Sequence, residues 1–242
     1  MSQFDRINPR VHLAITWSAV PLIVFFFIGM VPMSGFIPPP SPLASPAEIV
    51  YFYTSHLTSL RLGLVVSALS FTLMFAWGCA IAVWTWRIER GFPILTFTQL
   101  VCCSAGSALT FMIFLVWSVA SFRPDVYAPE TILMLNDLGW FLFLWIVPPF
   151  SLWSVAMGWA ILQDNSATPT YPRWTAFVCF WEAALMESTM LIALFKQGPF
   201  AFNGILGFWS PVIAFFIWMA VMTLYTHRAI MRKVREDQVE PV

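Results

Sequence analysis

Polar residues able to do chemistry are rare in this sequence, and most of them stand at the borders of long apolar segments. An isolated charge near hydrocarbon is costly, so we expect Arg61 or Arg123 to pair with Asp137. With nearby amides, these groups either form a small polar vestibule above an apolar cavity or only clamp helix ends. The candidate ligand-binding residues are Arg61, Arg123, Asp125, Asn136, Asp137, Glu187, Lys196 and Asn203.

Two carboxyl groups, Glu182 and Glu187, interrupt a single apolar segment. Carboxyl groups inside a membrane are candidates for function by default. Each of these two either relays protons, holds a polar group of a ligand, or forms a hydrogen bond to a neighbouring helix. A spacing of five residues places them about 140° apart on a helix, so they do not form a paired acid and base. Glu187 lies nearer the vestibule and is the stronger functional candidate.

Histidine and cysteine positions argue against a metal or haem centre. His12, His56 and His227 stand at expected helix ends or in a loop, so a buried multi-histidine site lacks ligands. The four cysteines lie inside apolar segments without metal-ligand spacing, and we expect free thiols. No catalytic triad can be assembled, and no cofactor is expected. The twelve basic and twelve acidic side chains cancel, so nucleic acid is not an expected partner.

The elements that must position these residues are membrane helices. Hydrophobic residues make up 60% of the chain and charged residues only 10%, against about 25% charged in soluble domains. A run of about 20 apolar residues crosses the roughly 30 Å hydrocarbon core. The sequence therefore predicts an all-α, polytopic transmembrane helix bundle, a single domain over residues 1–242, with spans at about 12–33, 59–86, 94–121, 134–162, 173–196 and 204–229. The first run lacks a prompt cleavage site, so it is read as a retained helix.

Prolines and caps predict several local features. The outer connection 34–58 starts with a proline-rich segment that cannot be regular helix. Ser45 and Glu48 then match a capping box around Pro46, which predicts a short amphipathic helix on the outer face. Proline also predicts kinks at Pro148-Pro149 and at Pro211. The carbonyls freed there need partners in neighbouring helices or water, and such a kink either borders a cavity or is purely structural.

Aromatic residues leave two alternatives open in the middle of the spans. Trp77, Trp145, Trp153 and Phe143 either line a pocket for a flat apolar molecule or take core and lipid-facing positions.

Basic residues predict the orientation, because they stay preferentially in short cytoplasmic loops. With both termini in the cytoplasm, only Arg61, Arg123 and Lys196 of the twelve basic residues fall outside. The cytoplasmic set is Arg6, Arg10, Arg87, Arg90, Arg173, Arg228, Arg232, Lys233 and Arg235, and residues 230–242 form a basic and polar cytoplasmic tail.

Several stretches, in this order, resemble a group of uncharacterised bacterial polytopic inner-membrane proteins, found particularly in actinobacteria and some proteobacteria. The similar stretches are 47–49, 122–125, 135–138 with Trp140, 172–174 and 195–204. The resemblance implies the fold and a place in the bacterial inner membrane, and it supplies no catalytic residue. Glu182 and Glu187 depart from the apolar or small residues expected before the 195–204 stretch.

The leading functional hypothesis is a non-enzymatic inner-membrane protein that binds an apolar or amphipathic small molecule, or acts as an accessory subunit of a membrane complex, through its outer half. Expected partners are membrane lipids, an apolar ligand, and complex subunits or further copies of the chain. The first alternative is a proton-coupled transporter that uses Glu187 or Glu182. A membrane-embedded lipid-modifying enzyme with outer carboxylates is the second.

Overall fold

The computed structural model describes residues 7–89 and 91–239, and within them every regular element is helical. Six helical stretches are long and apolar enough to cross a membrane, which confirms the predicted number of spans. Apolar side chains such as Phe25, Leu69 and Val101 are half or more exposed on the outside of the bundle, as expected where lipid replaces water as the solvent. The spans are Pro9–Met33, Leu57–Glu89, Ile94–Phe122, Pro129–Gln163, Trp174–Ala193 and Ile205–Gln238.

Most spans consist of more than one helical segment, whereas the third is the single helix α6 (Ile94–Phe122). The first span contains α1 (Pro9–Thr16), α2 (Ala19–Ile28) and the π-helical turn η2 (Gly29–Met33). The second contains α4 (Leu57–Phe71) and α5 (Leu73–Glu89), and the fourth contains α7 (Pro129–Trp145) and α8 (Val147–Gln163). The fifth runs from α9 (Trp174–Glu187) into the 3-10 helix η3 (Ser188–Ala193). The sixth starts as the π-helical turn η4 (Ile205–Trp209) and continues as α10 (Ser210–Val239).

The predicted capping box is present at the start of α3 (Pro46–Ser55). The backbone N–H of Ser45 donates to the Glu48 carboxylate at 2.7 Å, and the N–H of Glu48 donates to the Ser45 hydroxyl at 3.3 Å. These hydrogen bonds hold the pKa of the Glu48 carboxyl below its ordinary value. α3 buries Ile49 and Tyr53 while Tyr51 stays exposed, and it packs mainly on α7. The predicted short helix is therefore present, and its place on the outer face stays a prediction.

The fourth span breaks at Ile146, two residues before Pro148 and Pro149, where a kink was predicted. A proline at position 148 leaves the Leu144 carbonyl without its helical donor. The Thr189 hydroxyl of η3 donates to that carbonyl at 2.5 Å. A neighbouring helix therefore satisfies the freed group, as membrane burial requires.

The sixth span is irregular where it approaches Pro211, the second predicted site of distortion. In the π-helical register of η4, the donor for the Leu206 carbonyl would be residue 211, which as a proline has no N–H. The Ser188 hydroxyl donates to the Leu206 carbonyl at 2.6 Å instead. The adjacent residues Ser188 and Thr189 thus each donate a hydrogen bond to a backbone carbonyl that a proline leaves without its helical donor in another span.

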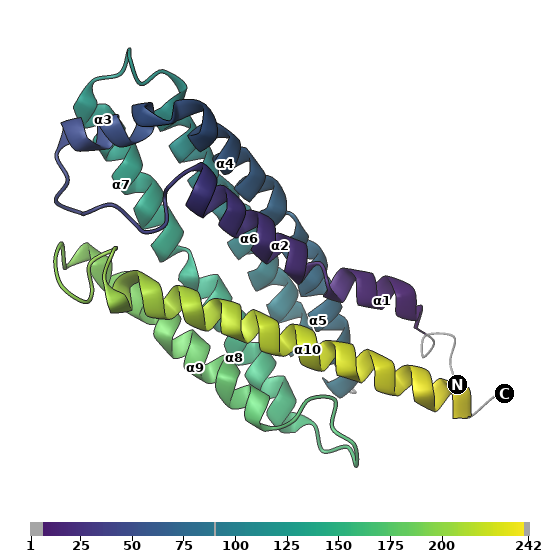
Figure 1. The fold of residues 1–242 in the computed structure, drawn as a ribbon. Coiled ribbons are helices and arrows are strands. Elements are labelled where there is room, and N and C mark those ends of the chain that lie inside the picture. The colour runs from purple at the N-terminus through teal and green to yellow at the C-terminus, as the bar shows by residue number, and fades with distance from the viewer. Residues whose placement is uncertain (1–6, 90, 240–242) are drawn as a thin grey trace.

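The first and last spans meet at one end of the bundle, whereas α3 and the connections 123–128 and 194–204 lie at the opposite end (Figure 1). The indole N–H of Trp17 donates to Nδ1 of His227 at 3.1 Å, which joins α1 to α10 at this end. Because six is an even number of crossings, the start of α1 and the end of α10 lie on the same side of the membrane. That this side is cytoplasmic stays a prediction, and Arg6, Arg90 and residues 240–242 of the predicted tail lie outside the described residues.

Candidate ligand-binding cavity

The polar residues predicted at the outer end form a smaller cluster than expected, centred on Asn136 of α7. Its side-chain oxygen accepts a hydrogen bond from the Tyr53 hydroxyl at 3.4 Å, and its amide donates to Asp137 at 3.5 Å. The backbone carbonyl of Asn136 accepts from the indole of Trp117 at 3.4 Å. Burial and the nearby charge of Asp137 raise the pKa of Tyr53 well above its ordinary value. The cluster therefore ties α3, α6 and α7 together.

The predicted pairing of Arg61 or Arg123 with Asp137 is wrong. The Arg61 guanidinium donates to the carbonyls of Ser121 at 2.6 and 3.0 Å and of Phe122 at 2.8 Å, so it caps the end of α6. Arg123 is exposed, with its guanidinium 5.2 Å from the centre of the Phe122 ring. The carbonyls at a helix C-terminus need donors, and this requirement outweighs pairing with a more distant carboxylate. Among residues 7–89 and 91–238, only Lys233 and Asp237 form an ion pair.

The remaining outer candidates lie at the surface of this end. Lys196 is exposed, and its positive charge acts on Asp137 without reaching ion-pair distance. Asp125 is exposed in the connection between α6 and α7, and Asn203 is half-buried before η4. The structure thus brings Asn136, Asp137 and Lys196 into one neighbourhood, whereas Arg61 is engaged with the backbone of α6.

Glu182 and Glu187 occupy opposite environments on α9. Glu182 is 0% exposed, and neither of its carboxyl oxygens has a hydrogen-bond partner among the residues that the structure describes. Glu187 is exposed on the outward face of the same helix. The buried hydroxyl of Ser154 on α8, which also lacks a hydrogen-bond partner, faces Glu182. An unsatisfied buried carboxyl group is expensive, which singles out Glu182 rather than the sequence-favoured Glu187.

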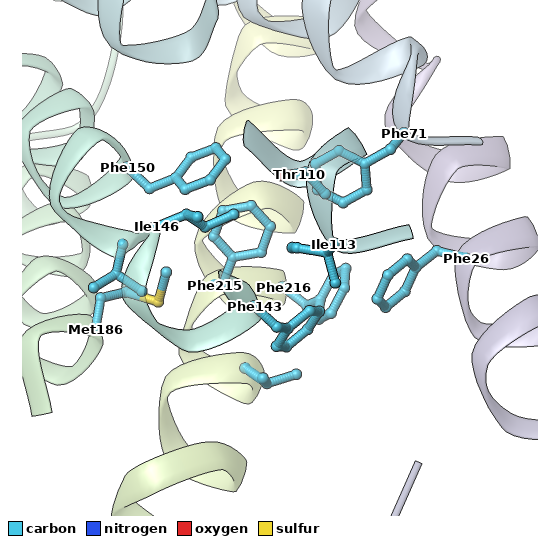
Figure 2. Close-up of a pocket in the computed structure, with 12 residues that line it drawn as sticks. Phe26, Phe71, Thr110, Ile113, Phe143, Ile146, Phe150, Met186, Phe215 and Phe216 are labelled. Carbon is cyan, nitrogen blue, oxygen red and sulfur yellow. The ribbon is translucent and has the colours of Figure 1, made fainter. Parts of the chain in front are cut away.

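A cavity of about 60 Å³ lies inside the bundle, and its lining is almost entirely apolar. Figure 2 shows the rings of Phe143, Phe150 and Phe215, from three different helical segments, turned towards the same space. Gly106 on α6 allows this packing, because a Cβ atom there would come within 2.7 Å of the Phe150 ring. The lining residues are Phe26, Phe71, Thr110, Ile113, Phe143, Ile146, Val147, Phe150, Met186, Val212, Phe215 and Phe216.

The cavity lies where the spans are broken. Ile146 at the break of the fourth span lines it, as do Met186 shortly before η3 and Val212 shortly after Pro211. Helix breaks at membrane depth are tolerated where they are buried in protein or border a cavity, and in transporters they form binding sites. The two predicted proline irregularities therefore border one internal site.

Three tryptophans pack directly beside the cavity. The indoles of Trp77, Trp153 and Trp218 lie 5.3–5.4 Å apart between ring centres, and all three are fully buried. Phe150 and Phe215 from the cavity wall contact Trp153 and Trp218, at 6.4 and 5.8 Å. Of the aromatic residues proposed from the sequence, Phe143 lines the cavity and Trp77 and Trp153 adjoin it. Trp145, in contrast, is 44% exposed and points outwards.

A second apolar hollow, of about 360 Å³, lies on the surface between α2 and the start of the sixth span. Phe27, Trp209 and Ile213 contribute to its lining. Val212 and Phe216 line both this groove and the internal cavity. The cavity and the groove therefore share part of their walls.

A polar cavity of about 200 Å³ occupies the opposite end, between α5, α10 and the connection after α8. Asp164 lines it and accepts hydrogen bonds from the N–H and hydroxyl of Ser166, at 3.1 and 2.6 Å, and from the N–H of Thr170, at 2.7 Å. Burial alone would raise the pKa of Asp164, but these hydrogen bonds outweigh it and lower the pKa below its ordinary value. Arg232 donates to the Pro169 carbonyl at 2.9 Å. Asp164 and Arg232 therefore order this connection.

Sequence reasoning missed several residues of the site. Ser188 and Thr189 read as ordinary polar residues in an apolar segment, although a serine-threonine pair near the depth of prolines in other spans is a signal for carbonyl capping. Tyr53 stands among apolar residues in the sequence, and nothing there indicates that its hydroxyl bonds to Asn136. The cavity residues Phe26, Phe71 and Phe215 carry no signal, because any phenylalanine in a span looks the same in sequence.

Comparison of the chain with family models, with curated proteins and with solved structures gives no match. The resemblance to bacterial inner-membrane proteins therefore stays a prediction, and the interpretation of the cavity depends on its own geometry.

Proposed function

We propose that this multi-pass membrane protein binds an apolar or amphipathic small molecule inside the bilayer, in the cavity beside the broken spans. The observation that supports the proposal is the cavity itself, an aromatic-lined space among three irregular helices. Ligand sites between bundled helices are mostly apolar with a few orienting polar groups. The small volume holds only a few carbon atoms of an alkyl chain, so one end or one segment of such a ligand occupies the cavity and the rest of the ligand lies outside it.

The ligand enters from the lipid in this proposal. The groove between α2 and α10 opens on the apolar surface of the bundle, and Val212 and Phe216 line both the groove and the cavity. Rotation of one phenylalanine side chain then connects the two spaces. The proposed location is the bacterial inner membrane with both termini in the cytoplasm, where the protein handles lipids or hydrophobic substrates, alone or as an accessory subunit of a complex.

Filling the cavity tests this function. Ile113 of α6 is fully buried and lines the cavity, whereas Leu115 of the same helix is 54% exposed. We expect Ile113→Trp to reduce saturable labelling by a photoreactive dodecanol probe by about tenfold in lipid nanodiscs, because the larger side chain occupies the site. The matched variant Leu115→Trp should label like the wild type. Equal labelling of both variants would show that the cavity does not hold the probe.

A proton-coupled transporter is the second candidate, and the complete burial of Glu182 without a hydrogen-bond partner favours it. Intramembrane carboxyl groups of this kind occur in proton relays. Replacement of Glu182 and of Glu187 by Gln should then stop proton-coupled uptake, and unaltered uptake in both variants would eliminate this candidate. The outer carboxylates Asp125 and Asp137 are respectively exposed and bonded to Asn136, so nothing favours a lipid-modifying enzyme.

A further inference from the structure

We infer that Glu182 binds a positively charged ammonium group at one end of the ligand, whose apolar body occupies the cavity. This inference depends on the proposed function and names the class of ligand, a lipophilic ammonium compound. It starts from the isolation of Glu182, whose carboxyl group is 0% exposed and has no hydrogen-bond partner.

Among the residues that the structure describes, no basic side chain forms an ion pair with this carboxyl group. Residues 174–193 contain neither lysine nor arginine, and the one ion pair among residues 7–89 and 91–238, Lys233 with Asp237, lies in the last part of α10. A carboxylate taken out of water without a partner is strongly destabilising. A cation supplied by a ligand removes that cost, so a charge on the ligand adds to its affinity.

The surroundings of Glu182 also suit an ammonium group. Trp153 precedes Ser154, the α8 residue that faces Glu182. One turn before Glu182, the Cys179 thiol contacts Met222 of α10 at 4.0 Å, and Met222 lies one turn beyond Trp218. Indole faces attract ammonium groups through cation–π interactions, and a carboxylate with aromatic side chains is a recurrent ammonium site. The Ser154 hydroxyl supplies a further acceptor.

The distance from the cavity to Glu182 matches one amphipathic molecule. Glu182 and Met186 are four residues apart on α9, which corresponds to about 6 Å along the helix, and Met186 lines the cavity. On α8, Phe150 of the cavity and Ser154 have the same spacing. Glu182 does not itself line the cavity, so a ligand whose apolar end enters the cavity has to place its charged end about one helical turn away.

Two photoreactive probes with the same dodecyl chain test the inference, one ending in trimethylammonium and the other in hydroxyl. Each carries a diazirine beside its end group and is added to the full-length protein in lipid nanodiscs. In Glu182→Gln, we expect half-maximal labelling by the ammonium probe to require about tenfold more probe, as expected for loss of a charge interaction. The hydroxyl probe should shift by less than about twofold. Glu130→Gln, which changes an exposed carboxyl group at the start of α7, is the matched control and should not change either probe.

The outcomes separate this inference from the proposed function. If neither probe labels the wild type saturably, the proposed function fails. If both probes label saturably and Glu182→Gln affects them equally, only the ammonium inference is overturned. Should Glu182→Gln not fold, the labelled residues of the wild type decide the matter. Labels from the ammonium probe around Ser154, Cys179 and Trp218 support the inference, and labels confined to the cavity or to the groove between α2 and α10 overturn it.

Discussion

At the scale of single residues, some polar groups form hydrogen bonds within the bundle and others have no hydrogen-bond partner there. Arg61 gives its donors to the end of α6, and Asn136 bonds to Tyr53, Asp137 and Trp117. Glu182 has no hydrogen-bond partner. Buried polar groups are normally bonded. Among the described residues whose buried polar atoms lack a partner, Glu182 is the only one with a carboxyl group, so it is more informative than the charged residues that first attract attention in the sequence.

Asp164 gives a prediction with a defined pH dependence. Its lowered pKa means that the carboxylate stabilises the fold above its ordinary pKa of about 4, and that this contribution disappears as the pH falls through the lowered value. We expect Asp164→Asn to reduce the free energy of unfolding by about 1 to 3 kcal/mol at pH 7. An asparagine loses the charge and places an N–H donor against one of the two backbone N–H groups.

Denaturant unfolding in detergent at pH 7 and at pH values below 4 measures this effect. The difference between wild type and Asp164→Asn should shrink as the pH falls. A difference of the same size at both pH values would mean that the asparagine acts by altered packing rather than by loss of charge.

At the scale of helices, prolines leave one backbone carbonyl without a donor in each of two spans, and a short segment of a third span donates hydrogen bonds to both carbonyls. The Leu144 and Leu206 carbonyls both lack helical donors, and the hydroxyls of Thr189 and Ser188 bond to them. These two residues stand where α9 becomes the 3-10 helix η3. The three irregular spans are therefore joined by hydrogen bonds beside the cavity, which holds its walls in place.

The Thr189 hydrogen bond gives a prediction at this scale. We expect Thr189→Val to lower the free energy of unfolding by about 1 to 3 kcal/mol, because the substitution keeps the shape but leaves the Leu144 carbonyl unsatisfied in a buried position. Thr98→Val is the matched control, since the exposed Thr98 hydroxyl bonds only to the carbonyl of Ile94 in its own helix. Unfolding of both variants in the same detergent measures the difference. Equal losses would indicate that the bond to Leu144 contributes nothing specific.

At the scale of the whole molecule, the bundle has two chemically distinct ends and an apolar middle. One end contains α3, and the other contains the start of α1 and the end of α10 (Figure 1). The hydrogen-bonded cluster around Asn136 adjoins α3, whereas the contact of Trp17 with His227 and the polar cavity around Asp164 involve α10. The internal cavity lies between them and adjoins the lipid-facing groove across Val212 and Phe216. This arrangement suits a ligand that moves sideways from the bilayer.

The orientation of the bundle can be tested directly. With both termini in the cytoplasm, a green fluorescent protein fused after residue 242 should fluoresce in intact bacteria. Asp125→Cys, at an exposed position of the opposite end, should react with a membrane-impermeant maleimide added outside. Reaction at this position only after cell lysis would reverse the proposed topology.

The amino-acid sequence by itself determined the class of fold. Long apolar runs predicted six spans, the Ser45–Glu48 pattern predicted a capped helix, and Pro148, Pro149 and Pro211 predicted the irregular positions. Each of these features depends on local chemistry, namely on hydropathy over one helix length or on a missing or capped backbone hydrogen bond.

Only the tertiary structure decided which polar groups meet. The choice between Glu182 and Glu187, the partner of Arg61 and the phenylalanines around the cavity depend on how helices far apart in the sequence rotate and pack. Helix periodicity separates the faces of one span, but it does not say which face meets another span when all faces are apolar. The exposed Glu187 and the buried Glu182 are thus equivalent in sequence and differ only after the bundle has assembled.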